Sequence, residues 1–380
     1  MRKIISLLII ALLLTGGCSK KYRLKRENLS VESKWPYAHY QNDGNRFLAQ
    51  GKFNGQLDII WDYQSNDRPV GPLTIQHDYL VYPGGRNRLQ FLTIVDGKNK
   101  GRIKPKGMPR TGLVVKDSLG YFANEPKKGI IKCVNLLNGK TIWNKKVKDA
   151  LIGSIIVNNK LIIGSSEGVL VARDLYSGDL IWSYRNKERF SSAPIQVDDR
   201  LYLATDKGTV LILNPDDGTE TMKLELNSPI VNSPVYSKYV YFTSVTGDIY
   251  AVDPHSNAVV WEKNIGFPIW TSPAIGNATV YLGHNGGEVM ALDAENGDVK
   301  WRFKTTDVIR ASVIAVNDFI IAATMSGEVY TLNATDGSQI SQRKLKGAVL
   351  TSPVSDGDFV YVATEKGLIA CLGDNDGIEN

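Results

Sequence analysis

The chain has 380 residues and carries a formal net charge of +6 at pH 7. Residues 1–30 contain seven Lys or Arg and one Glu, so this leader accounts for the whole excess and residues 31–380 are balanced. The charge therefore does not indicate nucleic-acid binding, which would need its basic residues gathered on the folded domain itself.

The first element is an apolar run, Ile4–Leu14, that follows two basic residues. It is too short to span a bilayer and is typical of a secretory signal peptide. The sequence TGGC that ends at Cys18 resembles a bacterial lipobox, with Thr15 where leucine is usual. We expect residues 1–17 to be a lipoprotein signal peptide and Cys18 to be the acylated first residue. The alternative is an ordinary cleaved signal with an incidental cysteine.

Residues 18–34 are polar and basic, which is typical of a flexible, solvated tether. Basic residues beside an acylated cysteine favour anionic lipid headgroups, although a purely soluble linker fits the composition equally well. Ser19 resembles the second residue of lipoproteins that are passed to the outer membrane. We expect an outer-membrane lipid anchor in a bacterial cell envelope with the domain facing the periplasm, while retention at the inner membrane stays open.

The rest of the chain repeats itself about every 40 residues. A turn glycine recurs at spacings of 39 or 40 residues, at Gly129, Gly168, Gly208, Gly247, Gly287, Gly327 and Gly367. A position that opens each copy recurs at Pro72, Gly112, Ile155, Pro194, Pro234, Pro273, Val313 and Pro353. Eight copies are counted, and the first is degenerate, with Leu89 in place of the turn glycine. The unbroken repeat indicates one domain, although the length alone would suggest two or three.

Each copy has the pattern of four short antiparallel strands. In one copy the apolar runs are separated by Asp- and Gly-containing turns and lie at 192–198, 200–205, 208–214 and 219–225. Asp174, Asp253 and Asp293 are placed to close turns with their own side chains. A tryptophan eight residues after this turn position supplies bulk for burial between neighbouring sheets, at Trp143, Trp182, Trp261 and Trp301. Four strands per copy, repeated radially, predict an all-β, single eight-bladed β-propeller over residues 35–373.

The ring is expected to close on itself through its N-terminal strand. The eighth copy has only three strands before the polar tail, residues 374–380. Its missing outer strand matches Leu57–Tyr63, whose pattern repeats that of Asp179–Arg185. Pairing of this strand with the last blade would cover an otherwise open edge.

The residue types that carry catalysis form no constellation in this sequence. Cys133 and Cys371 occupy one repeat position, which predicts a small buried filler rather than a redox pair. The four histidines share no metal-ligand spacing, and no phosphate-binding loop or nucleophile elbow is present. We therefore predict no catalytic, cofactor-binding or metal-binding residues and no enzyme activity.

The loops that precede the innermost strands are expected to surround one mouth of the central channel. Side chains there differ from copy to copy, whereas the strands keep one pattern. Aromatic residues and arginine supply most interface hot spots. The candidate partner-binding residues are Phe190, Phe267, Trp270, Arg310 and Leu350. The alternative is that Trp270 and Phe190 simply plug the channel.

The ALD-x3-G-x3-W signature, at Ala291–Asp293, Gly297 and Trp301, resembles the pyrroloquinoline-quinone-like propeller repeat. The segment with Trp35, Asp43, Asn45 and Arg46 also looks like the opening segment of that superfamily. Its quinoprotein dehydrogenase branch uses adjacent cysteines, which this chain lacks. Signal, cysteine, tether and a single propeller resemble the BamB family of outer-membrane assembly lipoproteins.

This resemblance implies a membrane-anchored, non-catalytic scaffold that supports outer-membrane β-barrel protein assembly through protein–protein contacts. It implies protein partners of the assembly machinery, no cofactor and a monomeric propeller. The first alternative is an envelope propeller lipoprotein that binds or senses a glycan or peptide. The second is a quinone-dependent dehydrogenase.

Overall fold

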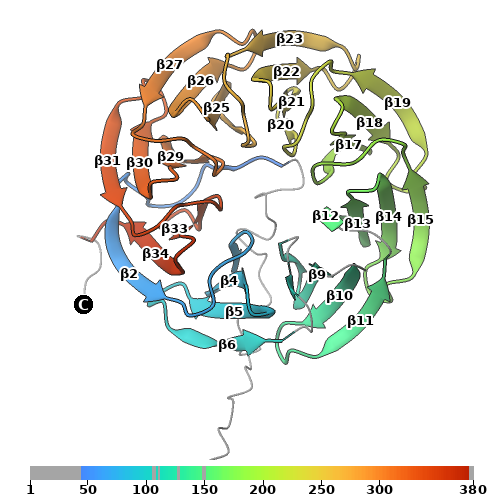
Figure 1. Ribbon diagram of the computed structural model, residues 1–380, viewed down its shortest axis with the longest axis horizontal. Helices are drawn as coiled ribbons and strands as arrows, with labels where there is room; N and C mark the ends of the chain where they lie inside the picture. Colours follow the sequence, from blue (N-terminus) through green and yellow to red (C-terminus); the bar gives the residue numbers. More distant parts are fainter. Residues whose placement is uncertain (1–43, 105–107, 110–111, 126–128, 148–150, 376–380) are drawn as a thin grey trace, which may run out of the picture.

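The computed structural model describes residues 44–375 except 105–107, 110–111, 126–128 and 148–150. The predicted signal peptide, Cys18, the tether and residues 376–380 of the tail lie outside the described residues. Within them the chain forms eight antiparallel sheets arranged as blades around a central axis (Figure 1). The predicted eight-bladed propeller is confirmed. Among these residues, no helix is long and apolar enough to cross a membrane.

Within each blade the strands follow one another from the innermost to the outermost position. The first blade comprises β3 (Thr74–Gln76), β4 (Tyr79–Gly84), β5 (Arg88–Thr93) and β6 (Asn99–Ile103), and the second comprises β7 (Met108–Pro109), β8 (Val114–Lys116), β9 (Leu119–Glu125), β10 (Ile130–Asn135) and β11 (Thr141–Lys146). The third blade comprises β12 (Leu151–Val157), β13 (Lys160–Ser165), β14 (Val169–Asp174) and β15 (Leu180–Arg185), and the fourth comprises β16 (Ile195–Val197), β17 (Arg200–Ala204), β18 (Thr209–Leu213) and β19 (Glu220–Glu225).

The fifth blade comprises β20 (Val235–Tyr236), β21 (Val240–Thr243), β22 (Asp248–Val252) and β23 (Val259–Asn264), and the sixth comprises β24 (Ala274–Gly276), β25 (Thr279–His284), β26 (Glu288–Asp293) and β27 (Val299–Lys304). The seventh blade comprises β28 (Ile314–Val316), β29 (Phe319–Ala323), β30 (Glu328–Asn333) and β31 (Gln339–Lys344), and the eighth comprises β32 (Val354–Ser355), β33 (Val360–Ala363), β34 (Leu368–Gly373) and β2 (Asp58–Gln64). A short strand, β1 (Phe47–Leu48), joins the seventh blade.

The turns follow the predicted chemistry. The backbone N–H groups of Tyr176 and Ser177 donate to the carboxylate of Asp174, as expected for an Asx turn. Six of the seven turn glycines have positive φ, where a Cβ would be strained: Gly168, Gly208, Gly247, Gly287, Gly327 and Gly367. The placement of Leu89 at this position in the first blade was wrong by two residues. The residue directly before β5 is Asn87, with φ 59°, and asparagine tolerates this conformation.

Tryptophans on the outer strands join neighbouring blades. The indole N–H of Trp182 donates to the carbonyl of Pro215 in the next blade at 3.0 Å. Its ring covers Gly218, where a Cβ would lie 2.5 Å from the ring. The same bond and contact recur at four other blade junctions, made by Trp61, Trp143, Trp261 and Trp301. A glycine in the last turn of one blade therefore makes room for the tryptophan of the blade before it.

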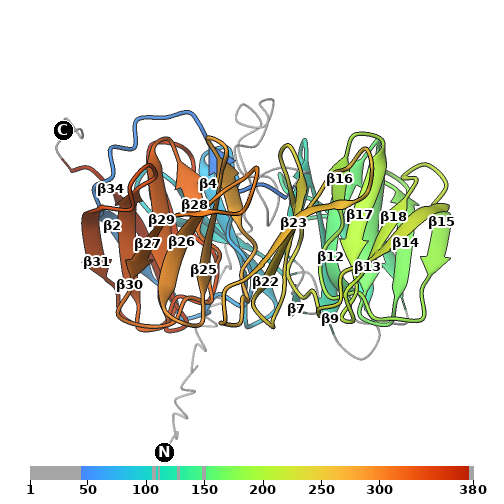
Figure 2. The ribbon, with the colours of Figure 1, turned by 90° about the horizontal axis from the view of Figure 1, so that it is seen from above.

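The N-terminal strand closes the ring as predicted, because β2 pairs antiparallel with β34 in the eighth blade. The residues before it form a second attachment that the sequence did not predict. The Asn45 side chain bonds both to the carbonyl and to the N–H of Ile275, and β1 pairs parallel with β28. Phe53 N–H then donates to the carbonyl of Gly357 at 3.0 Å. Residues 44–57 thus cross the sixth, seventh and eighth blades (Figures 1 and 2).

Each outer strand has a bulge at one equivalent position. In the third blade Ala172 pairs with Trp182 and Arg173 with Leu180, so Ile181 is the extra residue. The extra residue is apolar and exposed in four blades, at Ile142, Ile181, Val260 and Ile340. Bulges of this kind interrupt a sheet edge and oppose edge-to-edge pairing. These four exposed aliphatic side chains therefore lie on strand edges that the bulges protect from pairing with another sheet.

The propeller has two distinct faces, visible edge-on in Figure 2. The hairpin face carries the turns between the first and second strands, such as Asn277–Ala278, and residues 44–57 lie across it. The loop face carries the loops that lead from each outer strand to the next inner strand. The predicted partner-binding residues all lie in these loops, at residues 186–194, 265–273, 305–313 and 345–353.

Candidate functional site

In three loops of the loop face, a buried residue is followed directly by an exposed one. Ile269, Ile309 and Val349 are fully buried, whereas the residues that follow them, Trp270, Arg310 and Leu350, are exposed. The backbone N–H of each buried residue donates to a carbonyl at the end of a second strand, at 3.2–3.4 Å. The exposed side chains are therefore presented by loops with an anchored backbone.

Phe190 does not share this exposure, although the sequence pattern included it among the partner-binding candidates. Its side chain is 1% exposed and packs in the core between the third and fourth blades. Phe190 occupies the buried position of the alternation, equivalent to Ile269, and it forms a bridge to Thr205. Ser191, which follows it, is the residue equivalent to Trp270. Phe190 therefore supports the loop rather than offering a contact surface.

The four other candidates form the loop-face patch, which we define as Phe267, Trp270, Arg310 and Leu350. Phe267 is 45% exposed, Trp270 44% and Leu350 47%. The Arg310 guanidinium lies 5.6 Å from the centroid of the Trp270 ring, within the range of a cation–π contact. This contact links the loops of the sixth and seventh blades and fixes the orientation of both side chains. Their burial by a partner would therefore cost less conformational entropy.

A buried histidine that the sequence analysis did not single out lies beneath the patch. His284 is 1% exposed and stacks on the Phe267 ring, with centroids 5.2 Å apart and an interplanar angle of 12°. Burial lowers the pKa of His284 below its ordinary value. A comparison of the copies would have revealed it, because the same position holds Ser or Thr in five other blades: Ser165, Thr205, Ser244, Thr324 and Thr364.

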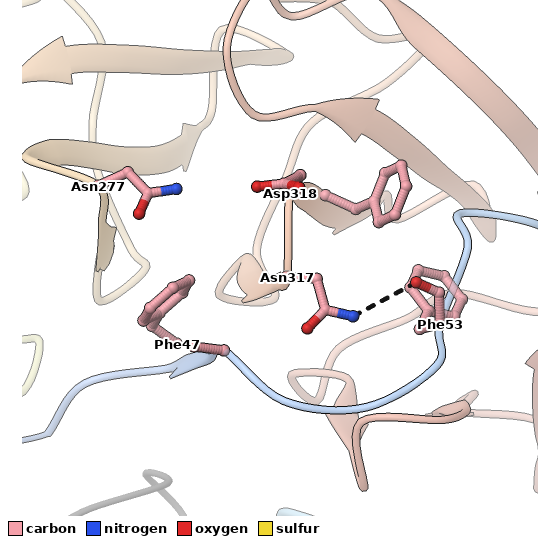
Figure 3. Close-up of a pocket in the computed structure, with 7 residues that line it drawn as sticks. Phe47, Phe53, Asn277, Asn317 and Asp318 are labelled. Atoms are coloured by element: carbon pink, nitrogen blue, oxygen red, sulfur yellow. Dashed lines mark hydrogen bonds between the residues drawn. The ribbon is translucent and has the colours of Figure 1, made fainter.

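A pocket of about 460 Å³ lies on the hairpin face, next to the N-terminal segment (Figure 3). The rings of Phe53 and Phe319, which line it, meet edge to face at 5.7 Å. The Asn317 amide donates to the carbonyls of Gly51 and Phe53. The remaining polar lining, Asn277 and Asp318, is exposed. The pocket is therefore the seam along which the N-terminal segment docks.

The two described cysteines are buried fillers, as the repeat position predicted. Cys133 pairs with Trp143 and Cys371 with Trp61 across the third and fourth strands. Both thiols are free, and burial raises the pKa of Cys133 to about 11. Within the part of the chain that the structure describes, no three His, Cys, Asp or Glu side chains gather as metal ligands.

Comparison with protein families finds one family model across most of the propeller. The model described as outer membrane protein assembly factor BamB matches residues 127–232 and 221–377. The outer membrane protein assembly factor BamB of Francisella salina is 26% identical over 149 residues, which cover 37% of this chain and 28% of that protein. The aligned part thus spans less than a third of that relative's length.

Comparison with solved structures finds the same ring. The structure of BamB from Moraxella catarrhalis has a TM-score of 0.73 and 16% identity, covering 84% of this chain and 100% of that one. A quinohemoprotein alcohol dehydrogenase from Pseudomonas putida HK5 has a TM-score of 0.77 and 11% identity, covering 91% and 81%. At these identities both likenesses concern the fold alone.

Proposed function

This chain belongs to the outer membrane protein assembly factor BamB family, and we propose that it is a membrane-anchored, non-catalytic scaffold. In this proposal it supports the assembly of outer-membrane β-barrel proteins through protein–protein contacts, as a lipoprotein on the periplasmic side of the outer membrane. The name of the relative in Francisella salina, an assembly factor, supports this role.

The observation that carries the proposal is the loop-face patch. Two aromatic rings, an arginine and a leucine are exposed on anchored loops of the loop face, and the arginine lies against one of the rings. This composition is that of a protein-binding hot spot, in which aromatic rings and guanidinium groups bury much area and keep directional contacts.

We expect Trp270→Ala and Arg310→Ala each to weaken partner binding by about 2 kcal/mol or more, about a thirtyfold loss of affinity. The fold should be nearly unaffected, because both side chains are exposed. Crosslinking and pull-down from cell envelopes, compared with the wild-type protein, measure the loss.

The matched control for these variants is Tyr176→Ala. Tyr176 is 52% exposed and lies in the turn after β14, on the hairpin face. Its removal should leave the captured partners at the wild-type level. If the Trp270 and Arg310 variants also capture partners at that level, the loop face is not the docking surface.

The membrane anchor is tested separately through Cys18, which lies outside the described residues. We expect Cys18→Ser to abolish acylation and to move the protein from the membrane fraction to the soluble periplasmic fraction. Metabolic labelling with a fatty acid and fractionation after a salt wash report the two effects. Retention of the variant in washed membranes would argue against a lipid anchor.

A further inference from the structure

His284 replaces a residue that closes the turn between the second and third strands in other blades. In four of those blades a Ser or Thr hydroxyl accepts a hydrogen bond from the backbone N–H four residues later, at the first residue of the third strand. The accepting hydroxyls are those of Ser165, Thr205, Ser244 and Thr324. In the sixth blade the imidazole bonds within the turn instead, since Gly286 N–H, two residues later, donates to His284 Nδ1 at 3.0 Å. A hydroxyl does not titrate near neutral pH, whereas an imidazole does.

The hydrogen bond determines the tautomer of His284. Because Nδ1 accepts a hydrogen bond from the Gly286 N–H, the neutral ring carries its own proton on Nε2. This Nε2 lies 3.7 Å from a carboxylate oxygen of Glu288, beyond hydrogen-bond range. A second proton would therefore bind Nδ1, and two N–H groups would then face each other. This side-chain hydrogen bond would be lost, whereas the backbone bond from Gly287 N–H to the carbonyl of His284 would remain.

The same turn holds two of the three loops that carry the loop-face patch. Asn285 N–H donates to the carbonyl of Pro268 at 3.0 Å, one residue from Phe267 and two from Trp270. Ile309 N–H donates to the carbonyl of His284 at 3.4 Å, directly before Arg310. Phe267 itself stacks on the imidazole. A movement of this turn would therefore be transmitted to three of the four patch residues.

Charged groups on two strands act on the imidazole, and the neighbouring loop carries two more. Burial is the main effect that lowers the pKa of His284, with Lys304 and Arg302 on β27 acting in the same direction and Glu288 on β26 opposing them. Lys304 also donates to the carbonyl of Gly286 at 2.7 Å. The next loop adds Asp307, whose carboxylate accepts from Val308 N–H, and Arg310, which lies against Trp270.

We propose that His284 is a proton-sensitive latch of the loop-face patch: the neutral imidazole holds the turn and its two loops in the binding geometry, and protonation at Nδ1 releases them. The biological meaning of the latch rests on the proposed docking function, but the latch itself does not. Because the folded-state pKa lies below 6.5, the unfolded chain takes up the proton first as the pH falls. The stabilisation from neutral His284 is therefore complete above about pH 6.5 and declines below it.

Amide hydrogen exchange of the full chain tests the latch without any partner. We expect segments 284–288 and 266–271, corrected for intrinsic exchange rates, to exchange roughly two- to tenfold faster at about pH 5 than at about pH 7.5. In His284→Thr, which restores the residue type of the other blades, this difference should disappear. His255→Thr removes an exposed histidine on the hairpin face and should leave the difference intact.

A pH dependence that persists in His284→Thr, or that is absent from the wild-type protein, would overturn the latch. An NMR titration needs no variant: the Gly286 amide shift should follow the His284 imidazole with one midpoint below 6.5, and independent midpoints would contradict the proposal. Pull-down at both pH values then tests docking separately. A latch seen by exchange, together with unchanged capture by Trp270→Ala, would reject the docking role alone.

Discussion

Deletion of Leu57–Tyr63 is expected to open the ring and to remove most of its stability. The deletion takes away Leu57 and Trp61, which are 2% and 9% exposed, each worth about 1.5–3 kcal/mol of burial. It also leaves β34 without its outer neighbour and ends the bond from Trp61 to the carbonyl of Ile94. A loss of about 3–6 kcal/mol is a large part of the 5–15 kcal/mol that stabilises a typical domain.

Chemical denaturation and thermal melting of the purified variant measure this effect. Where the deletion variant is too unstable to purify, Trp61→Ala gives the same test in milder form, with an expected cost of about 3–5 kcal/mol. The matched control is Ile59→Ala on the same strand, because Ile59 is 40% exposed and should cost less than about 0.5 kcal/mol. A wild-type melting temperature in the deletion variant would mean that another segment closes the eighth blade.

Gly218→Ala is expected to destabilise the junction between the third and fourth blades by about 2–5 kcal/mol. Gly218 has φ +74°, a conformation that strains any residue with a Cβ. The new methyl group would also lie 2.5 Å from the Trp182 ring, which cannot retreat without breaking its bond to the carbonyl of Pro215. Overpacking of this kind adds to the backbone strain.

Gly266→Ala separates the two contributions. Gly266 has nearly the same φ, +77°, but a Cβ there would meet nothing within 4 Å. It should therefore show the backbone strain alone, about 1 kcal/mol. Denaturation midpoints of both variants, measured side by side, give the cost of displacing the tryptophan as their difference. Equal destabilisation would mean that the ring moves away freely and does not join the blades.

The architecture of this protein was predictable because its determinants are local and recur. Turn glycines at a fixed period and Asx residues such as Asp174 depend on a few neighbouring residues, and the paired Trp and Gly of five junctions recur at one repeat position. The closing strand was predictable for the same reason, since the pattern around Trp61 repeats that around Trp182. Eight copies of one weak signal exclude other folds more firmly than any single copy would.

The site and the N-terminal attachment depended on contacts between distant residues. Phe190 and Trp270 both read as aromatic loop residues, and only the alternation along the anchored loops buries one ring and exposes the other. The pairing of β1 with β28 and the bond from Asn45 to Ile275 join residues about 230 or more apart and follow no repeat. His284 meets Gly286 and Glu288 within its own hairpin, whereas Phe267 reaches its ring from the preceding loop. A periodic sequence determines the shared scaffold, because every copy must bury the same face. The role of a residue that departs from the repeat can be assigned only when the tertiary structure shows what that residue contacts.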